Sequence, residues 1–201
     1  MGQRSQIYLR YNGRLVFAQY YQWNYAERMI SRARWGIEHV KERAQYPFTF
    51  RDPSYVEEMR RIFDVNFDMR DVQISINIVK EYNDLVGAGE TWMGTFNEYV
   101  FNKQDNNDGQ LFVDIQDNDL YYCFRAKPDR DDDEIGLIMD AKQYMAWDMC
   151  DSYMSHLCPD EIKTYEENCK AIKEMATLMT PEQLSDFLHG DYSTKTGGIN
   201  K

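Results

Sequence analysis

The chain has 201 residues and a net charge of −11, and 43% of its residues are hydrophobic, so it can bury a core and is not a disordered polyelectrolyte. No run approaches the roughly 18 apolar residues of a membrane span, and residues 1–11 lack the apolar region of a signal peptide. These properties argue against a membrane or secreted class and predict a cytoplasmic protein.

The N-terminal segment predicts a hairpin followed by a helix. Residues 5–21 alternate apolar and polar side chains on both sides of Asn12-Gly13, a dipeptide that favours a type I′ turn. Residues 25–43 repeat apolar side chains at helical spacing. Asn24 is expected to cap this helix, with Glu27 completing a capping box.

The next two segments predict a short helix and an ambiguous stretch. Asp52 followed by Pro53 is a typical helix start, because aspartate caps well and proline is tolerated at the first helical position. Residues 72–79 alternate β-branched and polar side chains, which favours a strand. The same residues also fit the start of a helix through Tyr82 to Val86, so both alternatives stay open.

The middle of the chain predicts a β-meander, and the rest predicts helices. The expected strands of the meander cover 95–102, 110–116 and 120–126, and a last short strand covers 134–140. The expected helices cover 141–157 and 159–179, and a short helix capped by Thr180 follows.

The order of these elements is hairpin, helices, meander and helices. Strands joined by tight turns form an antiparallel sheet, and helices that arrive in blocks pack against it, which predicts an α+β fold with a C-terminal helical segment. The expected division is one domain over 1–189, a candidate helical subdomain over 141–189 within it, and a flexible tail over 190–201.

Two short motifs resemble metal sites, but each fits a structural role better. QDNNDGQLFVDI resembles a calcium loop, but Gln104 and Ile115 stand where that loop needs a carboxylate, so a turn is favoured. Pro159–Lys163 has the letters of a metal-dependent nuclease, yet its two acids are adjacent at a helix start, where they favour the helix dipole. The four cysteines match no zinc spacing. We therefore expect no metal and no cofactor.

Acidic side chains form the first candidate interaction surface. Closely spaced carboxylates can stand in for phosphates in the nucleic-acid groove of a partner protein. The candidate residues are Asp114, Asp117, Asp119, Asp129, Asp131, Asp132, Asp133 and Glu134.

Basic side chains near the N-terminus form the alternative surface. Arginines interleaved with aromatic residues can bind single-stranded nucleic acid by phosphate contact and base stacking. The competing interpretation is that the aromatic residues are core and the arginines pair with the acidic body. The arginines of the predicted helix, Arg28, Arg32 and Arg34, are expected to reach solvent or a partner. The candidate residues are Arg10, Arg14, Arg28, Arg32 and Arg34.

A third hypothesis is an enzyme whose acids converge only in the folded chain. The candidates would be Asp114, Asp117 and Asp119 together with Glu90. No spacing in the sequence supports this arrangement, and no catalytic signature is present, so we do not expect an enzyme.

Residues 2–40, 62–75 and 101–111 resemble a group of phage and prophage proteins of Firmicutes, and the resemblance lies mainly within residues 1–115. It implies a small protein that acts inside a bacterial host cell. Small acidic α+β proteins from such sources are often inhibitors of host defence, anti-CRISPR proteins among them. The expected function is therefore an acidic protein that inhibits a host nucleic-acid enzyme, such as a CRISPR effector nuclease, by occupying its nucleic-acid groove. Binding of nucleic acid by the basic surface is the alternative.

Overall fold

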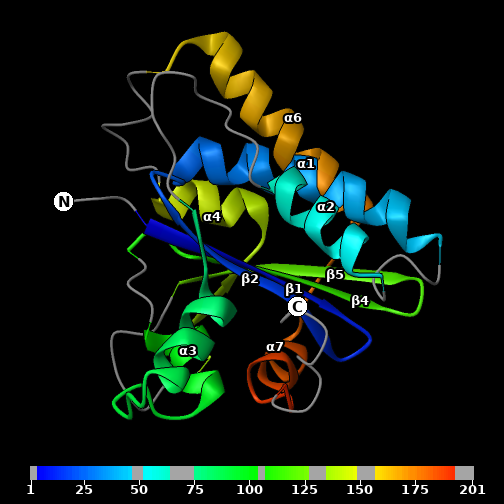
Figure 1. Cartoon of the computed structure of the whole chain (residues 1–201). Coiled ribbons are helices and arrows are strands. Elements are labelled where there is room, and N and C mark those ends of the chain that lie inside the picture. The colour runs from blue at the N-terminus through cyan, green and yellow to red at the C-terminus, as the bar shows by residue number, and fades with distance from the viewer. Residues whose placement is uncertain are drawn as a thin grey trace.

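The computed structural model places one mixed sheet between two layers of helices (Figure 1). It describes residues 4–46, 52–63, 75–103, 107–126, 135–148 and 157–192. The strands are β1 (Arg4–Tyr11), β2 (Arg14–Gln22), β3 (Ser75–Asn77), β4 (Gln110–Gln116), β5 (Asp119–Ala126), β6 (Leu137–Met139) and β7 (Thr177–Leu178). The helices are α1 (Ala26–Ala44), α2 (Pro53–Phe63), α3 (Ile78–Gly87), the π-helical turn η2 (Glu98–Lys103), α4 (Ala141–Asp148), α6 (Pro159–Met175) and α7 (Pro181–Leu188).

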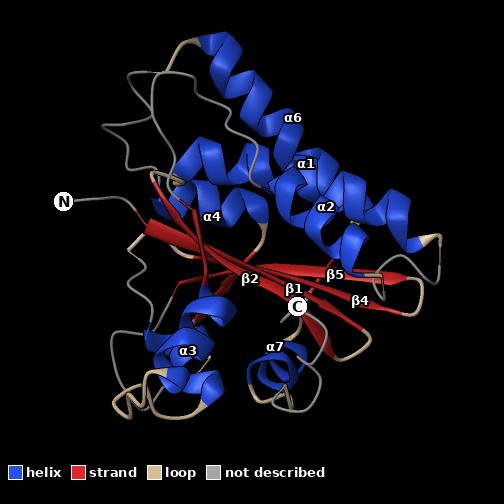
Figure 2. Ribbon diagram, viewed as in Figure 1, coloured by secondary structure: helices blue, strands red, loops and turns tan. Residues whose placement is uncertain are grey.

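The α+β class is confirmed, but the sheet is not purely antiparallel. Its strand order is β3-β2-β1-β4-β5-β6, and β7 pairs with β5. The β1–β4 and β5–β7 pairs are parallel, and the other pairs are antiparallel. Because β1 and β4 are parallel, the β1–β2 turn and the β4–β5 turn lie at the same end of the sheet (Figure 2).

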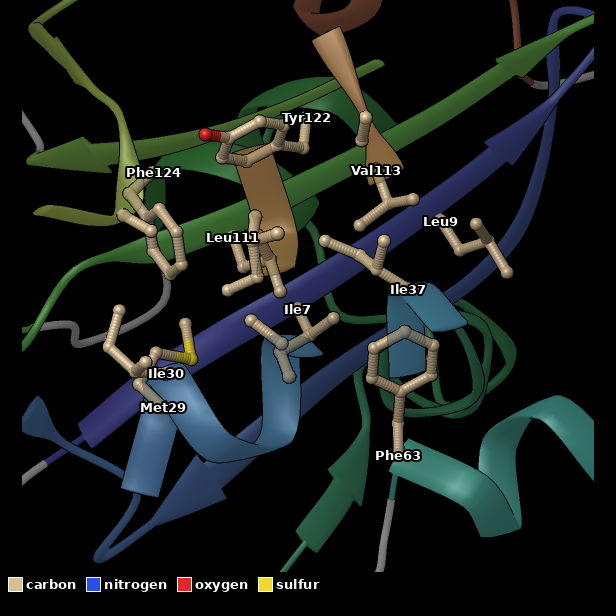
Figure 3. Close-up of a cluster of buried hydrophobic side chains, with 14 of the residues drawn as sticks. Ile7, Leu9, Met29, Ile30, Ile37, Phe63, Leu111, Val113, Tyr122 and Phe124 are labelled. Carbon is tan, nitrogen blue, oxygen red and sulfur yellow. The ribbon is translucent and has the colours of Figure 1, made fainter. Parts of the chain in front are cut away.

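Side chains pack on both faces of the sheet, so the described residues form two cores. Ile7 and Leu9 on β1 contact the layer of α1, α2, α4 and α6, whereas Tyr8 between them belongs to the core under α3, η2 and α7. In the first core, Ile7 and Leu111 from neighbouring strands lie beside Ile30 of α1 (Figure 3). None of the helices in the described ranges is both long and apolar enough to cross a membrane.

The predicted hairpin and several helix ends are confirmed. Asn12 and Gly13 have φ values of 45° and 72°, as a type I′ turn requires. Asp52 caps α2 by accepting a hydrogen bond from the Ser54 N–H at 2.8 Å. Thr180 and Gln183 form a reciprocal capping box at the start of α7.

The predicted cap of α1 is wrong. Tyr25, not Asn24, is the N-cap residue of this helix, and its side chain makes no capping hydrogen bond. The Asn24 side chain is instead buried and donates to Ser5 Oγ at 2.8 Å. The first N–H of α1 is instead bonded by Asp148, whose Oδ2 accepts from the Ala26 N–H at 2.6 Å.

The predicted strand over 95–102 is also wrong, because this segment is helical and contains η2. Thr95 and Glu98 cap it reciprocally, with the Thr95 N–H donating to Glu98 Oε2 at 2.7 Å. Consecutive apolar residues, Tyr99, Val100 and Phe101, are all buried against the second core. The apolar run therefore comes from burial on a helical turn and not from a strand.

The two alternatives for 72–79 each hold in part. Ser75–Asn77 forms β3, and Asn77 then caps α3 by accepting from the Lys80 N–H at 3.0 Å, while residues 72–74 lie outside the described residues.

The helix predicted over 159–179 ends at Met175, because residues 177–178 join the sheet as β7. Of the helix predicted over 141–157, the structure describes α4, and 149–156 lie outside the described residues.

Candidate functional site

Arg10 and Asp114, which the sequence assigned to opposite surfaces, form a buried ion pair. They occupy matched positions on β1 and β4. Arg10 Nε donates to Asp114 Oδ1 at 2.9 Å and its terminal nitrogen donates to Oδ2 at 2.7 Å, and both residues are buried. The guanidinium also contacts Asp186 Oδ2 at 2.9 Å and lies 4.6 Å from the centre of the Phe187 ring. The pair therefore connects α7 to the sheet.

This ion pair keeps Arg10 charged inside the protein. Burial alone would lower the pKa of Arg10, but the hydrogen bonds and charge of Asp114 raise it above its ordinary value. Gln116 Nε2 donates to Asp114 Oδ2 at 2.8 Å and completes the hydrogen bonding of the carboxylate. Neither charge is presented to a partner on the surface.

Arg32 is buried as well, so the prediction that it reaches solvent or a partner is wrong. Its Nε donates to Asn24 Oδ1 at 2.9 Å, and a terminal nitrogen donates to the Phe63 carbonyl oxygen. The guanidinium lies 4.6 Å from the centre of the Tyr21 ring. These contacts join β2, α1 and the end of α2, which is a structural role.

The other three candidate arginines lie nearer the surface. Arg28 donates to the Trp23 carbonyl oxygen at 3.1 Å and lies over the Tyr25 ring. Arg34 is exposed, and its Nε is 3.6 Å from Glu38 Oε2. Arg14 is half-buried at the start of β2. The five arginines do not form one continuous solvent-facing surface.

Asp117 and Asp119 are exposed at the β4–β5 turn. Asp117 has a φ of 56°, and its N–H donates to Asn12 Oδ1 at 2.8 Å, which joins the two turns at this end of the sheet. Asp119 borders a surface pocket of about 600 Å³ that Lys41 and Lys173 also line. The remaining acidic candidates, Asp129, Asp131, Asp132, Asp133 and Glu134, lie outside the described residues.

Exposed carboxylates outnumber exposed cations on the described part of the chain. The exposed acids are Glu42, Asp52, Asp84, Glu90, Glu98, Asp117, Asp119, Asp160, Glu161, Glu166, Glu167, Glu174, Glu182, Asp186 and Asp191. The exposed bases are Arg34, Lys41, Arg61, Lys80, Lys103, Lys142, Lys163, Lys170 and Lys173. The excess of acid in the composition is therefore found on the surface.

A second group of acids, at the opposite end of the sheet, has no signal in the sequence. The Asp108 carboxylate accepts from the Arg4 N–H, and burial raises its pKa to about 7. Burial also raises the pKa of Asp148, while hydrogen bonds from the Ala26 N–H and the Tyr144 hydroxyl oppose that rise. The Tyr144 hydroxyl is 2.7 Å from the Asp108 carbonyl oxygen and 3.1 Å from Asp148 Oδ2.

This second group holds backbone in place. Ala26 has a φ of 43°, in the left-handed region, and its N–H is fixed by Asp148. In the sequence Asp108 indicates only a turn, and Asp148 stands 40 positions later, so no local spacing could reveal the pair. The arrangement can take up a proton near neutral pH, and its hydrogen bonds serve the starts of β1 and α1.

The acids proposed for an enzyme do not converge on a metal site. Asp114 is engaged with Arg10, while Asp117, Asp119 and Glu90 are exposed. Within the described ranges, no group of three or more His, Cys, Asp or Glu side chains could hold a metal ion. Cys158 N–H donates to Glu161 Oε2 at 2.8 Å, so the acid of the nuclease-like motif caps α6, as predicted.

Comparison of the chain with protein-family models, with curated proteins and with solved structures found no match.

Proposed function

We propose that the chain is a phage-encoded acidic binding protein that inhibits a host nucleic-acid enzyme by occupying its nucleic-acid groove. The observation that carries this proposal is the excess of exposed carboxylates over exposed cations on the described part of the chain. The fold also buries Arg32, whereas the buried Arg10–Asp114 pair removes one charge of each sign from the surface. Such a surface is complementary to a groove that normally binds phosphates. A CRISPR effector nuclease is the first target to test.

The alternative, nucleic-acid binding by the N-terminal arginines, has less support. It requires Arg10 and Arg32 to contact phosphates, but both are buried. Only Arg14, Arg28 and Arg34 of the proposed set are accessible in part or in full. An acidic chain with a net charge of −11 would also repel nucleic acid at long range.

The first test is an affinity capture of the tagged chain from a lysate of a Firmicute host. The capture is run with and without nuclease treatment, and bound proteins are identified by mass spectrometry. A stoichiometric nucleic-acid enzyme that stays bound after nuclease treatment would support the proposal and name the target. Capture that disappears after nuclease treatment would show that nucleic acid is the partner and would reject it.

The mechanism of binding is tested with charge-neutral variants of the captured pair. The variants are Asp117→Asn with Asp119→Asn, and Asp131→Asn with Asp132→Asn and Asp133→Asn. Each set should weaken binding by about tenfold, and raising the salt from about 0.05 M to about 0.3 M should weaken binding of the unaltered chain. The matched control is Asp84→Asn with Glu90→Gln. Asp84 is on α3 and Glu90 follows its end, and α3 lies at the opposite side of the molecule from the β4–β5 turn (Figure 1). Affinity that is indifferent to both the variants and salt would eliminate phosphate mimicry.

A further inference from the structure

The end of α4 is joined to the starts of α1 and β4 through one carboxyl group and one hydroxyl group. Asp148 Oδ2 accepts from the Ala26 N–H at 2.6 Å and lies 3.1 Å from the Tyr144 hydroxyl. The same hydroxyl lies 2.7 Å from the Asp108 carbonyl oxygen. Tyr144 is fully buried, and a Cβ built on Gly109 would lie only 3.0 Å from its ring. The α4 helix therefore packs directly on the start of β4.

The two contacts of the Tyr144 hydroxyl require two protons. A tyrosine hydroxyl has one proton to donate, yet the carbonyl oxygen of Asp108 and the carboxyl oxygen of Asp148 both lie within hydrogen-bond distance of it. Because the contact to the carbonyl oxygen is the shorter one, it takes the hydroxyl proton. The contact to Asp148 is then a hydrogen bond only if the Asp148 carboxyl holds a proton of its own and donates it to the tyrosine oxygen.

The surroundings of Asp148 favour this proton. Burial is the main cause that raises the pKa of its carboxyl, and the charge of Glu27 raises it further. On β5, the guanidinium of Arg125 donates to Gln110 Oε1 and to the Ile135 carbonyl oxygen, so it is not directed at Asp148. The groups that act on the cluster from the elements around it are Arg4, through its backbone N–H, and the side chains of Glu27, Asp108, Tyr144 and Asp148.

We propose that Asp148 and Tyr144 form a pH-sensitive switch, which holds α4 against the start of β4 while Asp148 is protonated and releases it when that proton is lost. An ionised carboxylate is a stronger acceptor than a carbonyl oxygen, so it takes the Tyr144 proton. The Asp108 carbonyl oxygen then loses its hydrogen bond from Tyr144, which is costly inside a protein. The switch is separate from the acidic surface proposed above and does not depend on it.

Carbon NMR of the full chain, labelled at its aspartate carboxyl carbons, observes the proton of the switch directly. The Asp148 resonance is assigned by its absence from the spectrum of Asp148→Asn. In a titration over about pH 3 to 9, this carboxyl should ionise at a higher pH in the folded chain than in the chain unfolded by urea. Ionisation at the same or a lower pH in the folded chain would overturn the proposal.

Amide hydrogen exchange measures the release of α4. The Asp108 N–H donates to the Arg4 carbonyl oxygen at 3.0 Å, next to the bond that the switch controls. Its protection should fall about tenfold between about pH 5 and pH 8, after correction for the intrinsic exchange rate, while the Val113 amide in the middle of β4 keeps its protection. Equal losses at both amides would indicate global unfolding, and no loss at Asp108 would show that α4 stays in place. Either result would overturn the proposal.

Three variants assign the release to Asp148. Asp148→Asn carries no charge at any pH and its amide oxygen can still accept the Ala26 N–H, so protection of the amide of residue 108 should no longer depend on pH. Asp108→Asn should keep the response, which separates the switch from ionisation of the Asp108 carboxyl. Glu167→Gln removes an exposed acid of α6 and is the matched control, which should behave as the unaltered chain does. A response that persists in Asp148→Asn, or disappears in Asp108→Asn, would refute the assignment.

Discussion

At the scale of single residues, the Arg10–Asp114 pair makes the strongest prediction about stability. Asp114→Asn leaves the Arg10 guanidinium buried with only the contact to Asp186 to balance its charge. Removing one partner of a buried pair is strongly destabilising, so we expect a loss of about 3 kcal/mol in the free energy of unfolding, measured by urea denaturation.

The matched control for this variant is Asp117→Asn, which changes an exposed acid on the turn that follows the same strand. We expect it to stay within about 0.5 kcal/mol of the unaltered chain. Replacing both partners, with Arg10→Met and Asp114→Leu, should recover part of the loss, because no charge is then left buried. If Asp114→Asn were as mild as the control, the pair would not contribute to stability.

Asp108 predicts how stability changes with pH. Its pKa in the fold is about 7, raised from about 3.8, so the folded chain holds this proton more tightly than the unfolded chain does. Its contribution to stability is therefore complete below about pH 4 and is lost as the pH rises through 7. The raised pKa of Asp148 acts in the same direction.

The variant Asp108→Asn should remove this pH dependence. Its amide oxygen can still accept the Arg4 N–H, and it carries no charge at any pH. Between pH 5 and 8 the unaltered chain should lose about 1–2 kcal/mol more in its free energy of unfolding than the variant does, after allowance for solvent screening. Urea denaturation at a series of pH values measures both curves, and parallel curves would contradict the assignment.

Single residues also show where sequence reasoning reaches its limit. The charges of Arg10 and Asp114 are visible in the sequence, but they are 104 positions apart and meet only because β1 and β4 pair in parallel. Asp108 and Asp148 meet where the start of β4 approaches the end of α4. Contacts set by long-range topology leave no local periodicity, so neither pair could be predicted.

At the scale of elements, the contact between α1 and α2 depends on a glycine. A Cβ built on Gly36 would overlap the ring of Phe63, the last residue of α2. Gly36→Ala should therefore lower the free energy of unfolding by about 1–3 kcal/mol through displacement of α2, although alanine favours helix by about 1 kcal/mol. Thermal unfolding followed by circular dichroism measures the change.

Gly87→Ala is the control for this helix packing. Gly87 ends α3, and nothing lies within 4 Å of a Cβ built there. The alanine variant should be neutral or slightly stabilising, because only the helix preference of the side chain remains. A stabilising Gly36→Ala would mean that α2 does not pack closely on α1.

Elements whose ends carry strong local signals were predicted well. Asn12-Gly13 correctly predicted the hairpin turn, Asp52 the start of α2, and Thr180 the start of α7. The π-helical turn was missed although Thr95 and Glu98 form a capping box, because a buried apolar run fits a strand equally well. The two-residue strand β7 was missed because its only signal is its pairing with β5.

At the scale of the whole molecule, the C-terminal elements complete the fold. The α6 helix packs on the first core, β7 joins the sheet, and α7 covers the second core (Figure 1). Tyr192, which the sequence placed in a flexible tail, is buried, and its hydroxyl donates to the Phe187 carbonyl oxygen at 2.6 Å. The two-sided sheet could not be predicted, because the parallel β1–β4 pair is formed by strands about a hundred residues apart.

This architecture predicts that removal of the last elements abolishes cooperative folding. A chain ending at Ala176 lacks β7 and α7, exposes Phe112 and Phe101 of the second core, and leaves Arg10 without Asp186. Loss of the buried Phe187 alone should cost about 3–5 kcal/mol, which is a large part of the stability of a domain of this size. We expect the truncated chain to show no cooperative transition in differential scanning calorimetry, whereas a chain ending at Tyr192 should unfold as the full chain does. A sharp transition in the shorter chain, near the midpoint of the full chain, would show that β7 and α7 are not needed for the rest of the molecule to fold.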